Sequence, residues 1–133
     1  MSNSIIQVSL EGVADGLLMT REGFREFRKF HYNTCAEPWC SFLAYEDPTL
    51  KGYYNTRDRY VDRKFYTKLF NSIGKVRPSV LLNGRIAGIW SWNPNVNRIS
   101  VDWFRRITKN EGDVALAKQS ALENFLDESL NLF

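Results

Sequence analysis

Few residues in this chain could bind a metal ion or attack a substrate. Among its 133 residues there is a single histidine, His31, and there are two cysteines, Cys35 and Cys40. Together with Glu37 they would form a zinc site from one short segment, but this set falls short of the usual four ligands. We therefore expect two reduced structural cysteines, with no metal and no cofactor.

The side-chain patterns of common catalytic sites are also missing. One histidine leaves no Ser-His-Asp arrangement, and the segment GIWSW at 88–92 does not follow the Gly-x-Ser-x-Gly pattern of a nucleophile elbow. The adjacent acids Glu46 and Asp47 precede Pro48, where bonding to the backbone amides of a turn is favoured over acid–base chemistry. We predict no catalytic residue, and an enzyme is the least favoured class.

Positive charge is concentrated in the middle of the chain. From Lys51 to Arg77 there are eight basic and two acidic residues, a net charge of +6, so the other residues sum to −3 because the whole chain carries +3. Basic side chains can follow the phosphates of a nucleic acid, and interleaved aromatic residues such as Tyr54 can stack on bases. The opposite interpretation is a solvated face with its aromatic rings in the core, which a pI near 8.9 favours on composition alone.

The elements that must position these residues predict an α+β fold in a single domain over 1–133. The N-terminal part is expected to be strand, helix, strand, beginning with alternating residues over 4–12. A helix capped by Thr20 follows from Arg21 to about Tyr32, and a buried strand lies around 40–44. Farther along, Asp62 is predicted to cap a short helix over 63–72.

A tight hairpin at Asn83-Gly84 is the strongest local signal, because both residues tolerate the positive φ of a type I′ turn. It opens a small antiparallel sheet, a meander over about 79–104. Alternation places Trp90 and Trp92 on the face of Ile86 if Gly88 introduces no bulge, and we favour packing in the core over stacking on a base.

The C-terminal segment 112–130 is predicted to be a helix that covers the inner face of this sheet. Its apolar stripe is expected to consist of Val114, Ala117, Ala121, Phe125, Leu126 and Leu130. No stretch approaches the roughly 20 apolar residues of a membrane helix, and the first residues lack the layout of a signal peptide. We therefore expect a cytoplasmic protein with no membrane partner.

Two blocks of sequence resemble a known family. FLAYEDPTLKGYYNTRDRYVD at 42–62 and FNSIGKVRPSVLLNGRIAGIWSW at 70–92 are similar in order and spacing to segments of the winged-helix DNA-binding-domain family that includes alkylpurine and interstrand-crosslink DNA glycosylases. The similarity covers roughly residues 38–130. It implies a protein related to DNA repair that corresponds to the C-terminal portion of a larger winged-helix protein.

The departures from that family bear on activity. Its catalytic Gln-x-Gln or Gln-x-Asp motif is absent, because Gln7 is followed two residues later by Ser9 and Gln119 by Ala121. Ala44 also stands where the family usually has proline. A glycosylase must engage a damaged nucleotide and stabilise the departing base, so no excision chemistry is expected here.

The positive segment and the resemblance together predict a catalytically silent nucleic-acid-binding module, with double-stranded DNA as its ligand. The predicted phosphate contacts are Lys51, Arg57, Arg59, Arg63, Lys64, Arg77 and Arg85. The alternative is a structural or interaction protein, a split or remnant half that docks on a partner carrying the winged helices.

Overall fold

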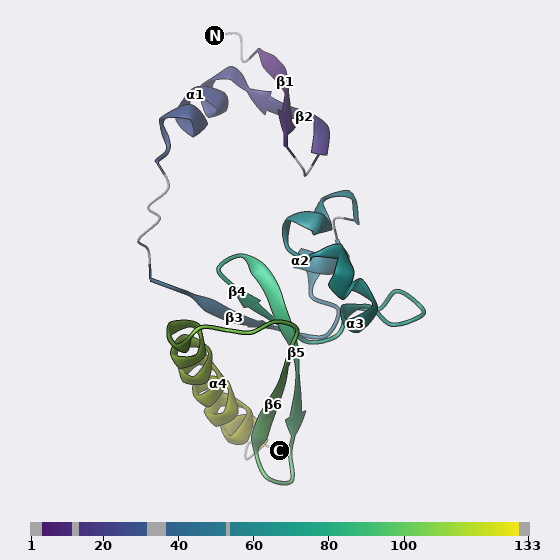
Figure 1. Cartoon of the computed structure of the whole chain (residues 1–133), viewed down its shortest axis with the longest axis vertical. Helices are drawn as coiled ribbons and strands as arrows, with labels where there is room; N and C mark the ends of the chain where they lie inside the picture. Colours follow the sequence, from purple (N-terminus) through teal and green to yellow (C-terminus); the bar gives the residue numbers. More distant parts are fainter. Residues whose placement is uncertain (1–3, 12–13, 32–36, 53, 131–133) are drawn as a thin grey trace. The chain divides into compact units, whose positions relative to one another are not determined.

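A computed structural model describes residues 4–11, 14–31, 37–52 and 54–130 of the chain (Figure 1). The contacts within the chain divide it into two compact units, residues 1–37 and residues 38–133. The single domain expected from the sequence, which contains no linker-like stretch, stays a prediction.

The first unit contains a β-hairpin followed by a helix. Strand β1 (Ile5–Leu10) pairs antiparallel with β2 (Ala14–Thr20), and α1 (Arg21–Lys29) follows directly. Thr20 caps α1 as predicted, because its hydroxyl accepts a hydrogen bond from the Gly23 N–H at 3.1 Å. Strand β2 was not predicted, because a glycine inside a sequence segment suggests a loop. Gly16 lies inside this strand and has a positive φ of 73°.

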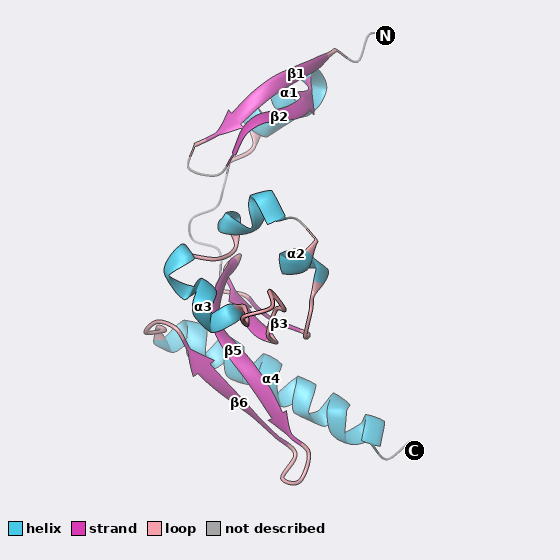
Figure 2. Ribbon diagram, turned by 90° about the vertical axis from the view of Figure 1, so that its right-hand side faces the viewer, coloured by secondary structure: helices cyan, strands magenta, loops and turns pink. Residues whose placement is uncertain are grey.

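The second unit is built on a four-stranded antiparallel sheet with the strand order β3-β4-β5-β6. These strands span Cys40–Leu43, Ser79–Leu82, Arg85–Asn93 and Arg98–Trp103. Between β3 and β4 the chain forms four short helices: α2 (Pro48–Lys51), η1 (Tyr54–Arg59), η2 (Arg63–Phe65) and α3 (Tyr66–Leu69). The long helix α4 (Lys109–Leu130) ends the unit (Figure 2). This confirms the α+β class, the meander and the C-terminal helix.

The β4–β5 hairpin turns at Asn83 and Gly84, whose φ angles of 50° and 83° are those expected for the predicted turn. A bulge follows, because Leu81 pairs with Ile86 while Val80 pairs with Gly88, which leaves Ala87 unpaired between them. The bulge changes which residues share a face.

Two clusters of buried side chains cover the two faces of the sheet. On one face Leu81 and Ile86 pack with Phe104 and with four residues of the β3–β4 connection. The four are Leu50, Val61, Leu69 and Val76. On the other face Val80, Leu82 and Ala87 pack with Ala115 of α4, and Trp90 is partly buried against them. Trp90 therefore belongs to the core, as predicted, but not to the face of Ile86, because the bulge lies between the two residues.

The face with which helix α4 covers the sheet matches the predicted stripe only in part, since Val114 packs against the buried cluster there. Ala117, Ala121 and Phe125 are exposed, and the side chain of Leu130 lies outside the described residues. The buried positions include Glu111, Ala115 and Glu123. The inward face is partly polar because Gln119 and Glu123 bond to the backbone of β6, which a hydrophobic pattern cannot indicate.

Candidate nucleic-acid interface

The two acids that precede Pro48 hold the start of the basic segment in place. Asp47 caps α2 by accepting a hydrogen bond from the Thr49 N–H at 2.9 Å. Glu46 accepts a hydrogen bond from the Val76 N–H, which is the largest cause of its lowered pKa, and pairs with Lys51 at 3.1 Å. Both carboxylates thus have the backbone-bonding role that was favoured over acid–base chemistry.

Three of the predicted phosphate contacts are paired with acids. Besides Lys51, Arg63 donates two hydrogen bonds to one oxygen of Asp58, from Nε at 2.9 Å and from Nη2 at 2.7 Å. Lys64 pairs with Asp62 at 3.0 Å. The hydrogen bond from the Tyr66 hydroxyl, followed by those from Arg63, lowers the pKa of Asp58, and the hydrogen bond from Lys64 lowers the pKa of Asp62. Each aspartate of the segment is therefore ionised and paired with a cation close to it in sequence.

Arg59 and Arg85 are brought together although they are far apart in sequence. Arg85 Nη1 donates a hydrogen bond to the backbone carbonyl of Arg59 at 3.3 Å. Both side chains are exposed, and neither forms an ion pair with a carboxylate within the ranges that the structure describes. Like Arg77, which is also exposed and in no ion pair among the described residues, they can therefore reach a phosphate.

A depression beside the β4–β5 turn gathers cations from three segments. Its volume is about 220 Å³, and it is lined by Lys64 of η2, Arg85 of β5 and Arg105 from the connection between β6 and α4, with Asp62 as the acid among them. Arg105 was not predicted, because it lies beyond the segment whose charge was counted. It is held by Glu111 through two hydrogen bonds of 3.1 and 2.8 Å.

Arg77 and Lys51 do not line this depression. The backbone N–H of Arg77 donates to the Leu69 carbonyl at 3.0 Å, and its side chain is exposed. Lys51 donates to the Gly74 carbonyl at 3.2 Å in addition to its pair with Glu46. The structure thus brings Lys64 and Arg85 to one depression, with the backbone of Arg59 bonded to Arg85, whereas Lys51 and Arg77 do not line it.

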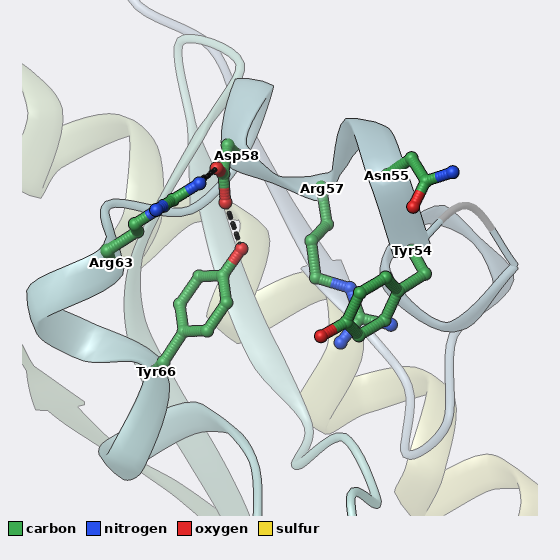
Figure 3. Close-up of a pocket in the computed structure, with 6 residues that line it drawn as sticks. All are labelled: Tyr54, Asn55, Arg57, Asp58, Arg63 and Tyr66. Atoms are coloured by element: carbon green, nitrogen blue, oxygen red, sulfur yellow. Dashed lines mark hydrogen bonds and ion pairs between the residues drawn. The ribbon is translucent and has the colours of Figure 1, made fainter. Parts of the chain in front are cut away.

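A larger depression of about 470 Å³ lies over η1 and α3 and includes another predicted residue, Arg57 (Figure 3). One wall carries Asp58, which accepts hydrogen bonds from the Tyr66 hydroxyl and from Arg63. Burial and the bond to Asp58 raise the pKa of Tyr66 to about 12. The other wall carries Tyr54, Asn55 and Arg57.

The aromatic residues of the basic segment divide into two groups. Tyr60, Phe65 and Tyr66 are partly buried and pack against the core, as the interpretation of a solvated face requires. Tyr54 is 75% exposed and remains available for stacking. Tyr53, the other tyrosine of this stretch, lies outside the described residues.

The metal site considered from the sequence falls partly within the described residues, which include His31, Glu37 and Cys40. Within the described residues no three histidine, cysteine or acidic side chains are grouped to hold a metal ion, and Cys35 lies outside those residues. Cys40 is a buried free thiol whose pKa is raised to about 11 by burial.

Within 4–11, 14–31, 37–52 and 54–130 there is no helix with the length and apolar character needed to span a bilayer. A scan against protein-family models, a search of curated proteins and a search of solved structures each found no match to this chain. The winged-helix resemblance therefore stays a prediction.

Proposed function

We propose that this chain is a cytoplasmic, catalytically silent nucleic-acid-binding module whose ligand is double-stranded DNA and whose relatives are the C-terminal regions of the glycosylase-like winged-helix family. One observation carries the proposal: the Arg85 guanidinium bonds to the backbone carbonyl of Arg59, 26 residues earlier in the chain, which brings the two residues together beside the β4–β5 turn. Both are exposed, and neither forms an ion pair with a carboxylate among the described residues, although the charge of Arg85 helps to lower the pKa of Asp62.

The surroundings of these two arginines support a phosphate contact. Lys64 and Arg105 line the adjacent depression together with Arg85. Asp62, the acid there, is already paired with Lys64. Because a guanidinium can donate two parallel hydrogen bonds to phosphate oxygens, Arg59 and Arg85 suit the backbone of a duplex better than lysines would.

Fluorescence anisotropy with a labelled blunt duplex, measured at low and moderate salt, tests the proposal. We expect binding that weakens with salt, since each neutralised phosphate releases condensed counterions. Replacing Arg59 and Arg85 together by glutamine should weaken binding and reduce the slope of log K against log salt by about 1.8. No binding at micromolar protein in low salt, or binding without a salt dependence, would refute the proposal.

A matched control removes the same charge elsewhere in the same unit. Arg98 lies opposite Asn93 in the sheet, at the other end of β5 from Arg85, where its exposed side chain forms an ion pair with Glu123 at 3.7 Å, and Lys118 is exposed on α4. The variant with Arg98→Gln and Lys118→Gln should keep the wild-type affinity and salt slope. An equal loss in both double variants would mean that net charge alone drives binding and that the Arg59–Arg85 surface is not the interface.

The second candidate function, docking on a protein partner that carries the winged helices, is favoured by the surface of α4. The stripe that the sequence predicted to be buried is exposed at Ala117, Ala121 and Phe125, and Phe125 is 63% exposed. Size-exclusion chromatography with light scattering tests it: an uncovered stripe predicts self-association that rises with concentration and that Phe125→Lys abolishes. A monomer at every concentration would count against this candidate.

A further inference from the structure

The depression over η1 and α3 contains an aromatic ring with one open face. The guanidinium carbon of Arg57 lies 4.5 Å from the centroid of the Tyr54 ring, so one face of that ring is covered. Tyr54 as a whole residue is nevertheless 75% exposed. Its second face is therefore available as a stacking platform, the arrangement that proteins use to bind unpaired bases.

Arg57 is fixed in position and lacks hydrogen-bond acceptors. Its guanidinium carbon also lies 4.6 Å from the centroid of Phe70, so two aromatic rings hold it. Its buried Nε has no hydrogen-bond partner, and the described residues accept no hydrogen bond from its other nitrogens. A ligand cannot reach the buried Nε, but the two terminal nitrogens of Arg57 have no acceptor among the described residues, so a ligand that brings acceptor oxygens can pair with them.

The opposite wall adds a second cation (Figure 3). Asp58 accepts hydrogen bonds from Tyr66 and Arg63, and both lower its pKa, so the carboxylate stays ionised and is already occupied. Two guanidiniums and one carboxylate give the depression a net charge of +1. Its volume of about 470 Å³ lies within the usual range for small-ligand sites.

We infer that this depression binds one unpaired nucleotide of a nucleic-acid strand. The base stacks on the open face of Tyr54, and the phosphate faces Arg57 and Arg63. The inference rests on the proposed function and makes it narrower: the module prefers duplexes that carry unpaired nucleotides, as at a tail, gap or junction, over fully paired ones.

The test compares two labelled ligands in fluorescence anisotropy: a blunt duplex, and the same duplex with a short unpaired tail. We expect the wild-type chain to bind the tailed duplex about tenfold more tightly. Tyr54→Ala should bring the affinity ratio of the two ligands to about one, whereas Tyr54→Phe should keep the preference because the ring is retained. Equal binding of both ligands, or a preference that Tyr54→Ala leaves intact, would overturn the inference.

A companion variant separates this site from the surface of the proposed function. Replacing Arg59 and Arg85 by glutamine should weaken binding of both ligands and leave their affinity ratio near the wild-type value. Salt-dependent binding of both duplexes without a tail preference would refute the nucleotide site alone. If the chain bound a single strand in a Tyr54-dependent manner but no blunt duplex, the duplex function would fail and the nucleotide site would stand.

A free nucleotide carries the same base and phosphate as a nucleotide within a strand, so it could occupy the same depression. Deoxyadenosine monophosphate is therefore added as a competitor, and we expect the tail preference to survive micromolar concentrations of it, because the strand supplies further phosphate contacts. Loss of the preference at micromolar competitor would show a site for free nucleotides and overturn the inference. Far-UV circular dichroism of each variant checks that the fold is retained.

Discussion

The backbone N–H of Ile99 on β6 donates a 2.7 Å hydrogen bond to the carboxylate of Glu123 on α4. The carbonyl of the same residue accepts a hydrogen bond from Gln119 at 2.9 Å. Because β6 is an outer strand of the sheet, these two helical side chains occupy the hydrogen-bonding positions that another strand would use. Helix α4 thus protects the sheet edge at Ile99 from pairing with a second chain.

The first prediction concerns this edge. Glu123→Ala leaves the buried N–H of Ile99 without an acceptor, so the free energy of unfolding should fall by about 1–3 kcal/mol. Urea denaturation followed by circular dichroism measures the change. Glu128→Ala, at an exposed position of the same helix, should alter stability by less than about 0.5 kcal/mol. A similar loss in both variants would contradict the role given to Glu123.

The start of α4 makes stability depend on pH. Thr108 and Glu111 form a reciprocal cap, in which each backbone N–H donates to the other residue's side chain, at 2.9 and 3.2 Å. Hydrogen bonds from Arg105 and from the Thr108 N–H lower the pKa of Glu111 to about 2. The carboxylate is therefore ionised in the folded protein far below its usual range.

The second prediction follows from the sign of that shift. Since the folded pKa lies below the unfolded one, the unfolded chain binds more protons between them, and stability falls as pH falls. Glu111→Gln should destabilise the protein by about 1–2 kcal/mol at neutral pH. Its deficit relative to wild type should shrink between about pH 4.5 and pH 2. Thermal unfolding across this range checks it, and a deficit independent of pH would exclude the ionised carboxylate as the cause.

The third prediction compares two glycines. A Cβ atom at Gly88 would lie 2.6 Å from the backbone carbonyl oxygen of Asp102 on β6, so Gly88→Ala must push the two strands apart. We expect a loss of about 1–3 kcal/mol. At Gly112 in α4 the nearest atom would be 3.7 Å away, and alanine there should stabilise by up to about 1 kcal/mol, because it is the better helix former. Urea midpoints of the two variants moving in the same direction would contradict this.

Local signals predicted the local structure well. Asn83-Gly84 gave the turn, and Thr20 and Asp62 cap the helices they precede, because each of these features depends on residues a few positions away. The face that α4 buries depends instead on Glu123 reaching Ile99, a residue 24 positions earlier. The bulge at Ala87 depends on how two strands pair. Periodicity within one segment contains neither kind of information.

In the candidate site, too, the residue types could be predicted from the sequence, whereas their contacts with residues far along the chain could not. The basic residues were identifiable from composition, but their pairing was not: Lys64 and Arg63 are bound to acids, whereas Arg59 meets Arg85 across 26 residues. Arg105 was missed because only the fold brings it to the β4–β5 turn. The stacking of Arg57 on the Tyr54 ring could not be predicted from the sequence either, because the tyrosines of this segment were equally compatible with a position in the core.

The last prediction uses the acid of the basic depression. Asp62 pairs with Lys64 at 3.0 Å, and its side chain also caps η2 by accepting from the Lys64 backbone N–H. Asp62→Asn keeps the capping oxygen, because asparagine caps helices about as well as aspartate, but it removes a negative charge and releases the lysine. If the depression contacts a duplex, blunt-duplex affinity at low salt should rise several-fold, and the salt slope should steepen by about 0.9, the value for one more phosphate contact. Glu128→Gln removes the same charge at an exposed position near the end of α4 and should leave both quantities unchanged. Fluorescence anisotropy measures the two variants side by side, and an equal gain in both would assign the effect to net charge and remove Lys64 from the interface.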